Sequence, residues 1–88
     1  MDWDPEKIDD AVLGLLFLTL HDGNRAWKNF DWDALNRLHA KGLIENPKNK
    51  NKSVALTPEG LELAQQSANE HFGAKDEQTW KALNTRQL

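Results

Sequence analysis

The stretch DWDALNRLHAKGLIENPKNKNKSVALTPEG, residues 31–60, decides the fold of this chain. Asp31 is a favourable N-cap, because its side chain can accept a hydrogen bond from a free backbone N–H in the first turn. Gly42 stands where a left-handed residue commonly ends a helix. The two signals predict a helix over about residues 32–41, and the rest of the chain is arranged around it.

Two short strands are predicted after this helix, at about residues 43–46 and 53–56, because apolar residues follow the two-residue period of a strand there. They would form a hairpin whose tip is residues 46–52, Asn-Pro-Lys-Asn-Lys-Asn-Lys, named here the lysine loop. Proline and asparagine favour turns. The tip carries three cations and no acid, and ordinary solubility does not account for that clustering.

Two further helices are predicted by one local signal, a capping side chain followed by proline and an acid. Asp4-Pro5-Glu6 opens a helix over about residues 5–20, and Thr57-Pro58-Glu59 opens another over residues 58–72. The fold class is therefore α+β and mostly helical, in one domain over residues 1–72. For residues 73–88 we expect a tail or a short helix at about 77–86, docked by Trp80.

The first helix is apolar nearly all round beyond Val12, so it must be covered on several sides. We expect it to be the central helix of the core. The alternative is a homodimer formed through its second apolar stripe, which comprises Leu13, Phe17 and Leu20.

The helix at 32–41 is expected to direct Leu35 and Leu38 inward, together with Trp32 and His39. Its opposite face would carry Asp33, Asn36, Arg37, Ala40 and Lys41. That face either lies against a partner or is solvated, and in the second case Asp33 and Arg37 would form a stabilising pair one helical turn apart.

Residues 24–30 read as a short strand or an irregular extended link, in which bulky and basic residues alternate loosely. Trp27 and Phe30, with Trp32 just beyond, are expected to anchor the core, because a small domain needs its large side chains for burial. The alternative is that they offer stacking faces to nucleic-acid bases beside Arg25 and Lys28.

The net charge of −3 conceals a basic middle. Residues 1–24 carry −5, residues 25–52 carry +4, and the remainder carries −2. A basic segment within an acidic chain suits a small nucleic-acid binder, although a strongly basic domain would be a stronger indication.

The sequence gives little indication of catalysis. It has no cysteine, so no disulfide or thiolate metal site can form, which fits a reducing compartment such as the cytoplasm. Its apolar run, residues 11–20, is too short to span a membrane and lacks the basic flank of a secretion signal. The three histidines are far apart, and no phosphate-binding glycine loop or nucleophile elbow is present. We therefore predict no enzyme, no metal, no cofactor and no small-molecule substrate.

The order of helix, L-x-x-L-x-x-K-G-L-I, basic hairpin tip, strand, L-T-P-E-G and helix resembles winged-helix proteins, especially regulators of the multiple-antibiotic-resistance type. The resemblance implies that the helix before Gly42 enters the major groove of DNA and that the hairpin, the wing, contacts its backbone. Most of the first 72 residues also resemble small bacterial proteins known only as a domain of unknown function, and that resemblance implies no activity.

One part of the winged-helix pattern is missing. A helix-turn-helix needs a positioning helix before the recognition helix, and residues 22–31 are too few for a helix and two turns. Either the segment RAWKNF makes one compressed turn, or the three-helix core is incomplete. Asp31 and Asp33 would also repel phosphates, although an acid can accept a hydrogen bond from cytosine.

We therefore expect a small winged-helix-like, helix-turn-helix-like module that binds duplex DNA with weak sequence specificity. The candidate nucleic-acid-binding residues come from the basic middle of the chain: Arg25, Lys28, Asn36, Arg37, Lys41, Lys48, Lys50 and Lys52. The alternative is a winged-helix-like module for protein interaction or dimerisation that binds no nucleic acid.

Overall fold

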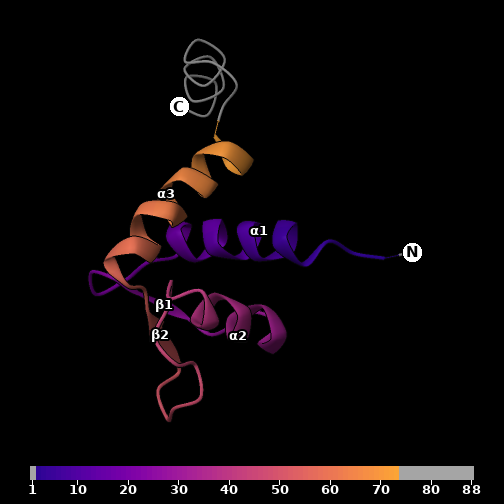
Figure 1. Cartoon of the computed structure of the whole chain (residues 1–88). Helices are drawn as coiled ribbons and strands as arrows, with labels where there is room; N and C mark the ends of the chain where they lie inside the picture. The colour runs from indigo at the N-terminus through magenta and orange to yellow at the C-terminus, as the bar shows by residue number, and fades with distance from the viewer. Residues whose placement is uncertain (1, 74–88) are drawn as a thin grey trace.

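The computed structural model describes residues 2–73 as three helices and a two-stranded antiparallel sheet, an α+β fold that is mostly helical (Figure 1). These residues include nearly all of the domain predicted over residues 1–72, whereas the tail or short helix expected beyond residue 73 lies outside the described residues. The elements in chain order are α1 (Pro5–Leu18), β1 (Arg25–Trp27), α2 (Trp32–Ala40), β2 (Ser53–Ala55) and α3 (Pro58–Phe72).

The central helix α1 begins as predicted, because the Asp4 carboxylate accepts a hydrogen bond from the N–H of Glu6. It ends at Leu18, two residues before the predicted end. The Thr19 hydroxyl donates to the carbonyls of the preceding turn, so the side chain competes for acceptors at the point where the helix stops. In residues 2–73, no helix is long and apolar enough to cross a membrane.

Small residues let α1 and α3 approach closely where they cross (Figure 1). A Cβ placed on Gly14 of α1 would lie 3.1 Å from the backbone nitrogen of Ala68 in α3. Ala64, one turn earlier in α3, is fully buried beside it in the core. The expected role of α1 as the core helix is confirmed, since it packs against α3, α2 and β1.

The observed sheet differs from the predicted hairpin. β2 lies where the second strand was expected, but its hydrogen-bonded partner is β1, with Ala26 opposite Val54. Residues 43–46 contribute only an isolated bridge between Ile44 and Leu56 on the other edge of β2. The segment at residues 24–30 therefore contains a strand, and that strand, instead of residues 43–46, forms the two-stranded sheet with β2.

No helix lies between α1 and α2, where the chain forms turns and β1. Of the two alternatives for this region, the incomplete three-helix core is the one found. β1 still serves the core, because Ala26 is fully buried against it.

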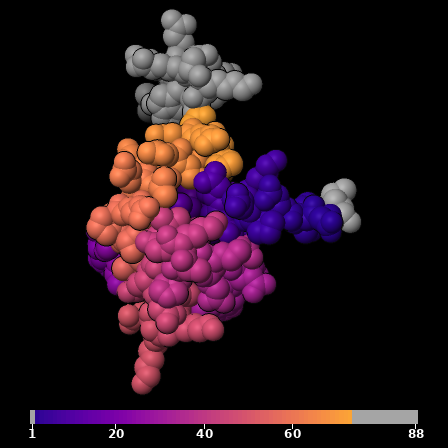
Figure 2. Space-filling model, viewed as in Figure 1, coloured from indigo at the N-terminus to yellow at the C-terminus, as the bar shows by residue number. Residues whose placement is uncertain are grey.

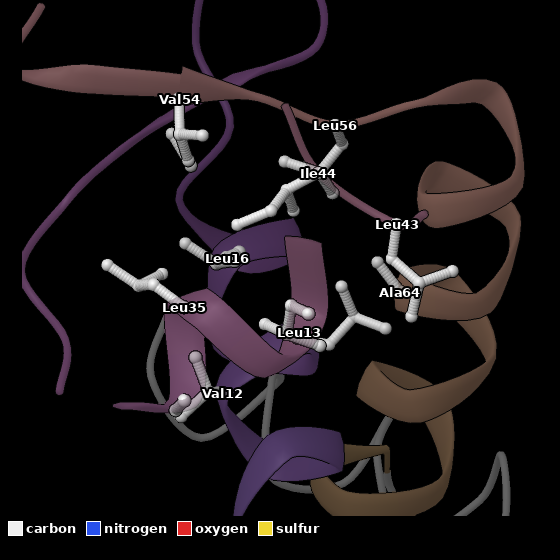
Figure 3. Close-up of a cluster of buried hydrophobic side chains, with 12 residues drawn as sticks. Val12, Leu13, Leu16, Leu35, Leu43, Ile44, Val54, Leu56 and Ala64 are labelled. Carbon is white, nitrogen blue, oxygen red and sulfur yellow. The ribbon is translucent and has the colours of Figure 1, made fainter. Parts of the chain in front are cut away.

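Aliphatic side chains from every element build the core, as Figure 3 shows for Leu13 and Leu16 of α1, Leu35 of α2 and Val54 of β2. The prediction that the aromatic residues anchor this core was partly wrong. Phe30 packs against the core, but Trp27 and Trp32 are 48% and 51% exposed. The aliphatic residues of the two strands and the helices fill the available interior without them.

The predicted inward face of α2 was likewise half right. Leu35 and Leu38 are buried, whereas Trp32 and His39 are exposed. The His39 ring is nevertheless held in place, since its Nδ1 lies 3.1 Å from the carbonyl oxygen of Ile44. Its position, one residue past Leu38, places it at the edge of the buried stripe.

The start of α3 is joined closely to the end of α2. The Thr57 hydroxyl accepts from the Gly60 N–H at 2.9 Å and donates to the Gly42 carbonyl at 2.8 Å. Gly60 packs so closely on Leu43 that an added Cβ would overlap the Leu43 carbonyl oxygen. Glycine at this position is therefore required by the contact between α3 and the segment that precedes the lysine loop.

Candidate nucleic-acid interface

The lysine loop projects from the sheet at the end of the molecule opposite the end of α3 (Figures 1 and 2). Lys48, Lys50 and Lys52 are all exposed. Within residues 2–73, none of their ammonium groups forms a hydrogen bond or an ion pair. Three unneutralised cations therefore lie on one small projection of the surface.

The asparagines between these lysines give the loop its shape. Asn46 accepts from the backbone N–H of Lys48 at 2.9 Å, and Asn49 accepts from that of Asn51 at 2.8 Å. The Asn49 amide also donates to the carbonyl of Asn46, and Pro47 is fully buried at the base. The alternation of asparagine and lysine thus separates two tasks, because the amides bind the backbone while the cations face solvent.

Lys28 connects β1 to the loop tip. Its ammonium group donates to the side-chain oxygen of Asn49 at 2.9 Å, and its backbone N–H donates to the carbonyl of Lys52 at 3.0 Å. These acceptors are neutral, so the positive charge of Lys28 adds to that of the loop. Four of the eight candidate residues are consequently brought together.

Arg25 fastens the base of the loop instead of facing a ligand. Its guanidinium donates to the hydroxyl and carbonyl of Ser53 at 2.8 and 3.0 Å and to the carboxylate of Glu45 at 3.2 Å. Glu45 in turn accepts from the N–H of Ala55 at 3.0 Å. The charge of Arg25 is thereby paired inside the domain, and the strands on either side of the loop are joined.

Arg37 and Lys41 are bound to Asp9, a carboxylate of α1 that is only 1% exposed. Arg37 makes three hydrogen bonds to the two Asp9 oxygens at 2.8 to 3.0 Å, and the Lys41 ammonium lies 3.4 Å away. Hydrogen bonding to Asp9 is the main reason that the pKa of Arg37 is raised above its usual value. We call these three residues the Asp9 cluster.

The cluster changes the interpretation of the helix face predicted to read DNA. Within the described residues, Arg37 pairs with Asp9 and forms no ion pair with Asp33, so the expected pair one turn apart is not found. Asn36, the remaining candidate on α2, is partly buried. The two cations of this face therefore share a structural partner, and its remaining charge, Asp33, forms no ion pair among residues 2–73.

A cavity of about 260 Å³ lies between α1, the end of α2 and α3. Leucines and carboxylates dominate its lining, which comprises Glu6, Asp9, Asp10, Leu13, Leu38, Lys41, Leu43, Leu63, Gln66, Ser67 and Glu70. The Ser67 hydroxyl, on its wall, is satisfied by the backbone carbonyl of Asp10. Among residues 2–73, no group of three or more potential ligands could hold a metal ion.

Asp9 is the important residue that the sequence analysis missed. It lies three, four and seven residues before Val12, Leu13 and Leu16, which are all buried, so it occupies the same stripe of α1. A carboxylate on a buried stripe must be paired with a cation. That spacing was the available signal, and it indicates that Asp9 needs a cationic partner without saying which one.

The comparison with protein families covers nearly the whole described domain. The family described as "Domain of unknown function (DUF6429)" matches residues 4–74. The chain belongs to this family. The match begins at the residue that caps α1 and ends just beyond α3, so the family domain includes both the lysine loop and the Asp9 cluster.

A relative in Sinorhizobium fredii (strain NBRC 101917 / NGR234), the "Uncharacterized protein y4hR", is 61% identical over 61 residues. The aligned part spans 69% of this chain and 82% of the relative. No solved structure gives a significant match.

Proposed function

We propose that this protein is a small winged-helix-like module that binds nucleic acid through its phosphates, with weak sequence specificity. The observation that carries the proposal is the lysine loop, where three exposed cations lack any acidic partner within residues 2–73. Lysines bind phosphates as point charges and release counterions when they do so, a mode of binding that needs no base-specific contact.

The order of elements supports the winged-helix-like part of the proposal. A strand follows the first helix and pairs with the strand that leaves the loop, while the segment before the loop bridges to that same strand. The loop then occupies the place of a wing. Because no positioning helix precedes α2 and its two cations are held by Asp9, the wing dominates the proposed contact.

The test is a salt titration of binding to a labelled duplex of about 20 base pairs, measured by fluorescence anisotropy. The Lys48→Ala/Lys50→Ala/Lys52→Ala variant should lower the slope of log affinity against log salt by up to about three, since each lost phosphate contact removes nearly one released counterion. Lys7→Ala is the matched control, because Lys7 is also exposed but lies in α1. Absence of micromolar binding by the wild type at about 50 mM salt, to a duplex and to a single strand alike, would refute the proposal.

The second candidate is a protein-interaction module, and the cavity between α1 and α3 favours it. Its leucines could receive apolar groups, and its carboxylates Glu6, Asp10 and Glu70 suit a partner segment carrying lysine or arginine. A basic amphipathic peptide should then bind the wild type and lose affinity in Glu70→Gln, with binding unchanged in the triple lysine variant. Failure of the peptide to bind the wild type, together with weaker duplex binding by the triple lysine variant, supports the nucleic-acid proposal.

A further inference from the structure

Trp27 is a large apolar side chain that this small domain leaves half exposed. It lies on β1, where side chains alternate between the two faces of the sheet. Ala26 faces the core and is fully buried, so Arg25 and Trp27 point to the outer face. The exposure of Trp27 therefore follows from the alternation of side chains along β1. In the sheet, Trp27 lies opposite Ser53 of β2.

The Trp27 ring is held in position by a neighbouring ring. His21 stacks on it with centroids 4.4 Å apart and an angle of 27° between the planes. His21 is itself fixed, because its backbone exchanges hydrogen bonds with Arg25 at 2.7 and 3.1 Å and its Nδ1 lies 3.0 Å from an Asp22 carboxylate oxygen. A ring that is already oriented loses less conformational freedom when a ligand stacks on it.

The exposed ring lies on a segment that leads directly into the proposed phosphate contacts. Lys28 follows Trp27 directly, and its side chain and backbone are bonded to Asn49 and Lys52 of the lysine loop. An aromatic face and a row of cations therefore lie on connected segments of one sheet and its loop. Proteins that bind single-stranded nucleic acid combine these two features, stacking bases on aromatic rings while lysines follow the backbone.

We propose that Trp27 is a stacking platform for an unpaired base and that the preferred ligand of the lysine loop is a single-stranded segment of nucleic acid. A base inside a duplex is already stacked on both sides, so it can lie on the Trp27 ring only when it is unpaired. This inference rests on the proposed function, because the lysines supply the phosphate contact that brings a base to the ring.

The experiment measures the affinity of the full chain for labelled oligothymidine of about 12 nucleotides and for a duplex of similar length. We expect Trp27→Ala to weaken oligothymidine binding about tenfold and to leave the salt slope and duplex binding unchanged, because the ring releases no counterions. Trp27→Phe should restore most of the lost affinity. Trp32→Ala, which removes the exposed tryptophan at the start of α2, should bind like the wild type.

The outcomes separate the platform from the phosphate contact. If Trp27→Ala binds oligothymidine within twofold of the wild type while the triple lysine variant loses affinity, the platform is refuted and the proposed function stands. If the wild type binds neither ligand, the proposed function fails and the platform fails with it. Far-UV circular dichroism of each variant shows whether the fold is retained, and Trp27→Phe provides the test if Trp27→Ala is unfolded.

Discussion

The two groups of cations that follow each other along the chain have opposite surroundings. Arg37 of α2 and Lys41, which caps its C-terminus, converge on one buried carboxylate, whereas Lys48, Lys50 and Lys52 project from a loop with no acidic partner in the described residues. Formal charge along the sequence makes the groups look alike. Only the position of Asp9 distinguishes a cation that holds two helices together from a cation that is available to a ligand.

The difference also separates stability from binding. Hydrogen bonds to a charged group contribute more than neutral ones, and a buried charge that loses its partner is costly. Exposed lysines on a loop contribute little to folding but can each neutralise a phosphate. The Asp9 cluster should therefore determine stability, and the lysine loop should determine the salt dependence of binding.

The largest expected effect is on the Asp9 cluster. Asp9→Ala should lower the free energy of unfolding by about 2 kcal/mol, because it removes the charged acceptor of the Arg37 hydrogen bonds from the interface of α1 and α2. Urea denaturation followed by circular dichroism measures the change. The triple lysine variant should remain within about 0.5 kcal/mol of the wild type.

Asp10→Ala is the control for this prediction, since Asp10 is the adjacent carboxylate and its pairing with His71 is exposed. Its loss should cost no more than about 1 kcal/mol. Arg37→Ala should destabilise more than Asp9→Ala, because it leaves the buried carboxylate with only the more distant Lys41. An Asp9→Ala protein as stable as Asp10→Ala would contradict the structural role of the cluster.

An intermediate effect on stability is expected at Arg25, a predicted nucleic-acid-binding residue whose charge is paired inside the domain. Arg25→Gln should lower the free energy of unfolding by about 1 kcal/mol, since its bonds to Ser53 and Glu45 join the two sides of the loop base. Lys28→Gln is the control and should change stability by less than about 0.5 kcal/mol. If both variants unfold at the same urea concentration, Arg25 does not fasten the loop.

Local signals in the sequence predicted the helices well. The predicted N-caps at Asp4, Asp31 and Thr57 are all found. α2 ends at Ala40, two residues before Gly42, which has the positive φ expected after a helix end. Each of these signals depends on residues within one turn. The pairing of β2 was not predictable in this way. Whether β2 pairs with residues 25–27 or with residues 43–46 depends on the packing of α1 against the sheet. Contacts between distant parts of the chain determine that packing, and no short stretch of sequence encodes them.

The candidate site shows the same limit. The lysine loop could be identified because residues 46–52 contain three lysines and no acid, and the fold supplies them with no acidic partner in the described residues. Its one acidic neighbour in sequence, Glu45, is paired with Arg25. The partners of Arg37 and Arg25, by contrast, lie 28 and 20 residues away in the chain. Trp27 was assigned to the core because its size favours burial, and the alternation of β1 overrides that preference.

The smallest effect compares one lysine from each group by the same substitution. Lys50→Gln should lower the salt slope of duplex binding by about 0.9, the contribution of one phosphate contact, whereas Lys41→Gln should leave the slope unchanged because its charge is directed at Asp9. Anisotropy titrations at four or more salt concentrations measure both slopes under identical conditions. Equal decreases in the two variants would mean that the end of α2 also contacts the phosphates of the nucleic acid. Lys41 would then be a ligand-facing cation and not a structural one.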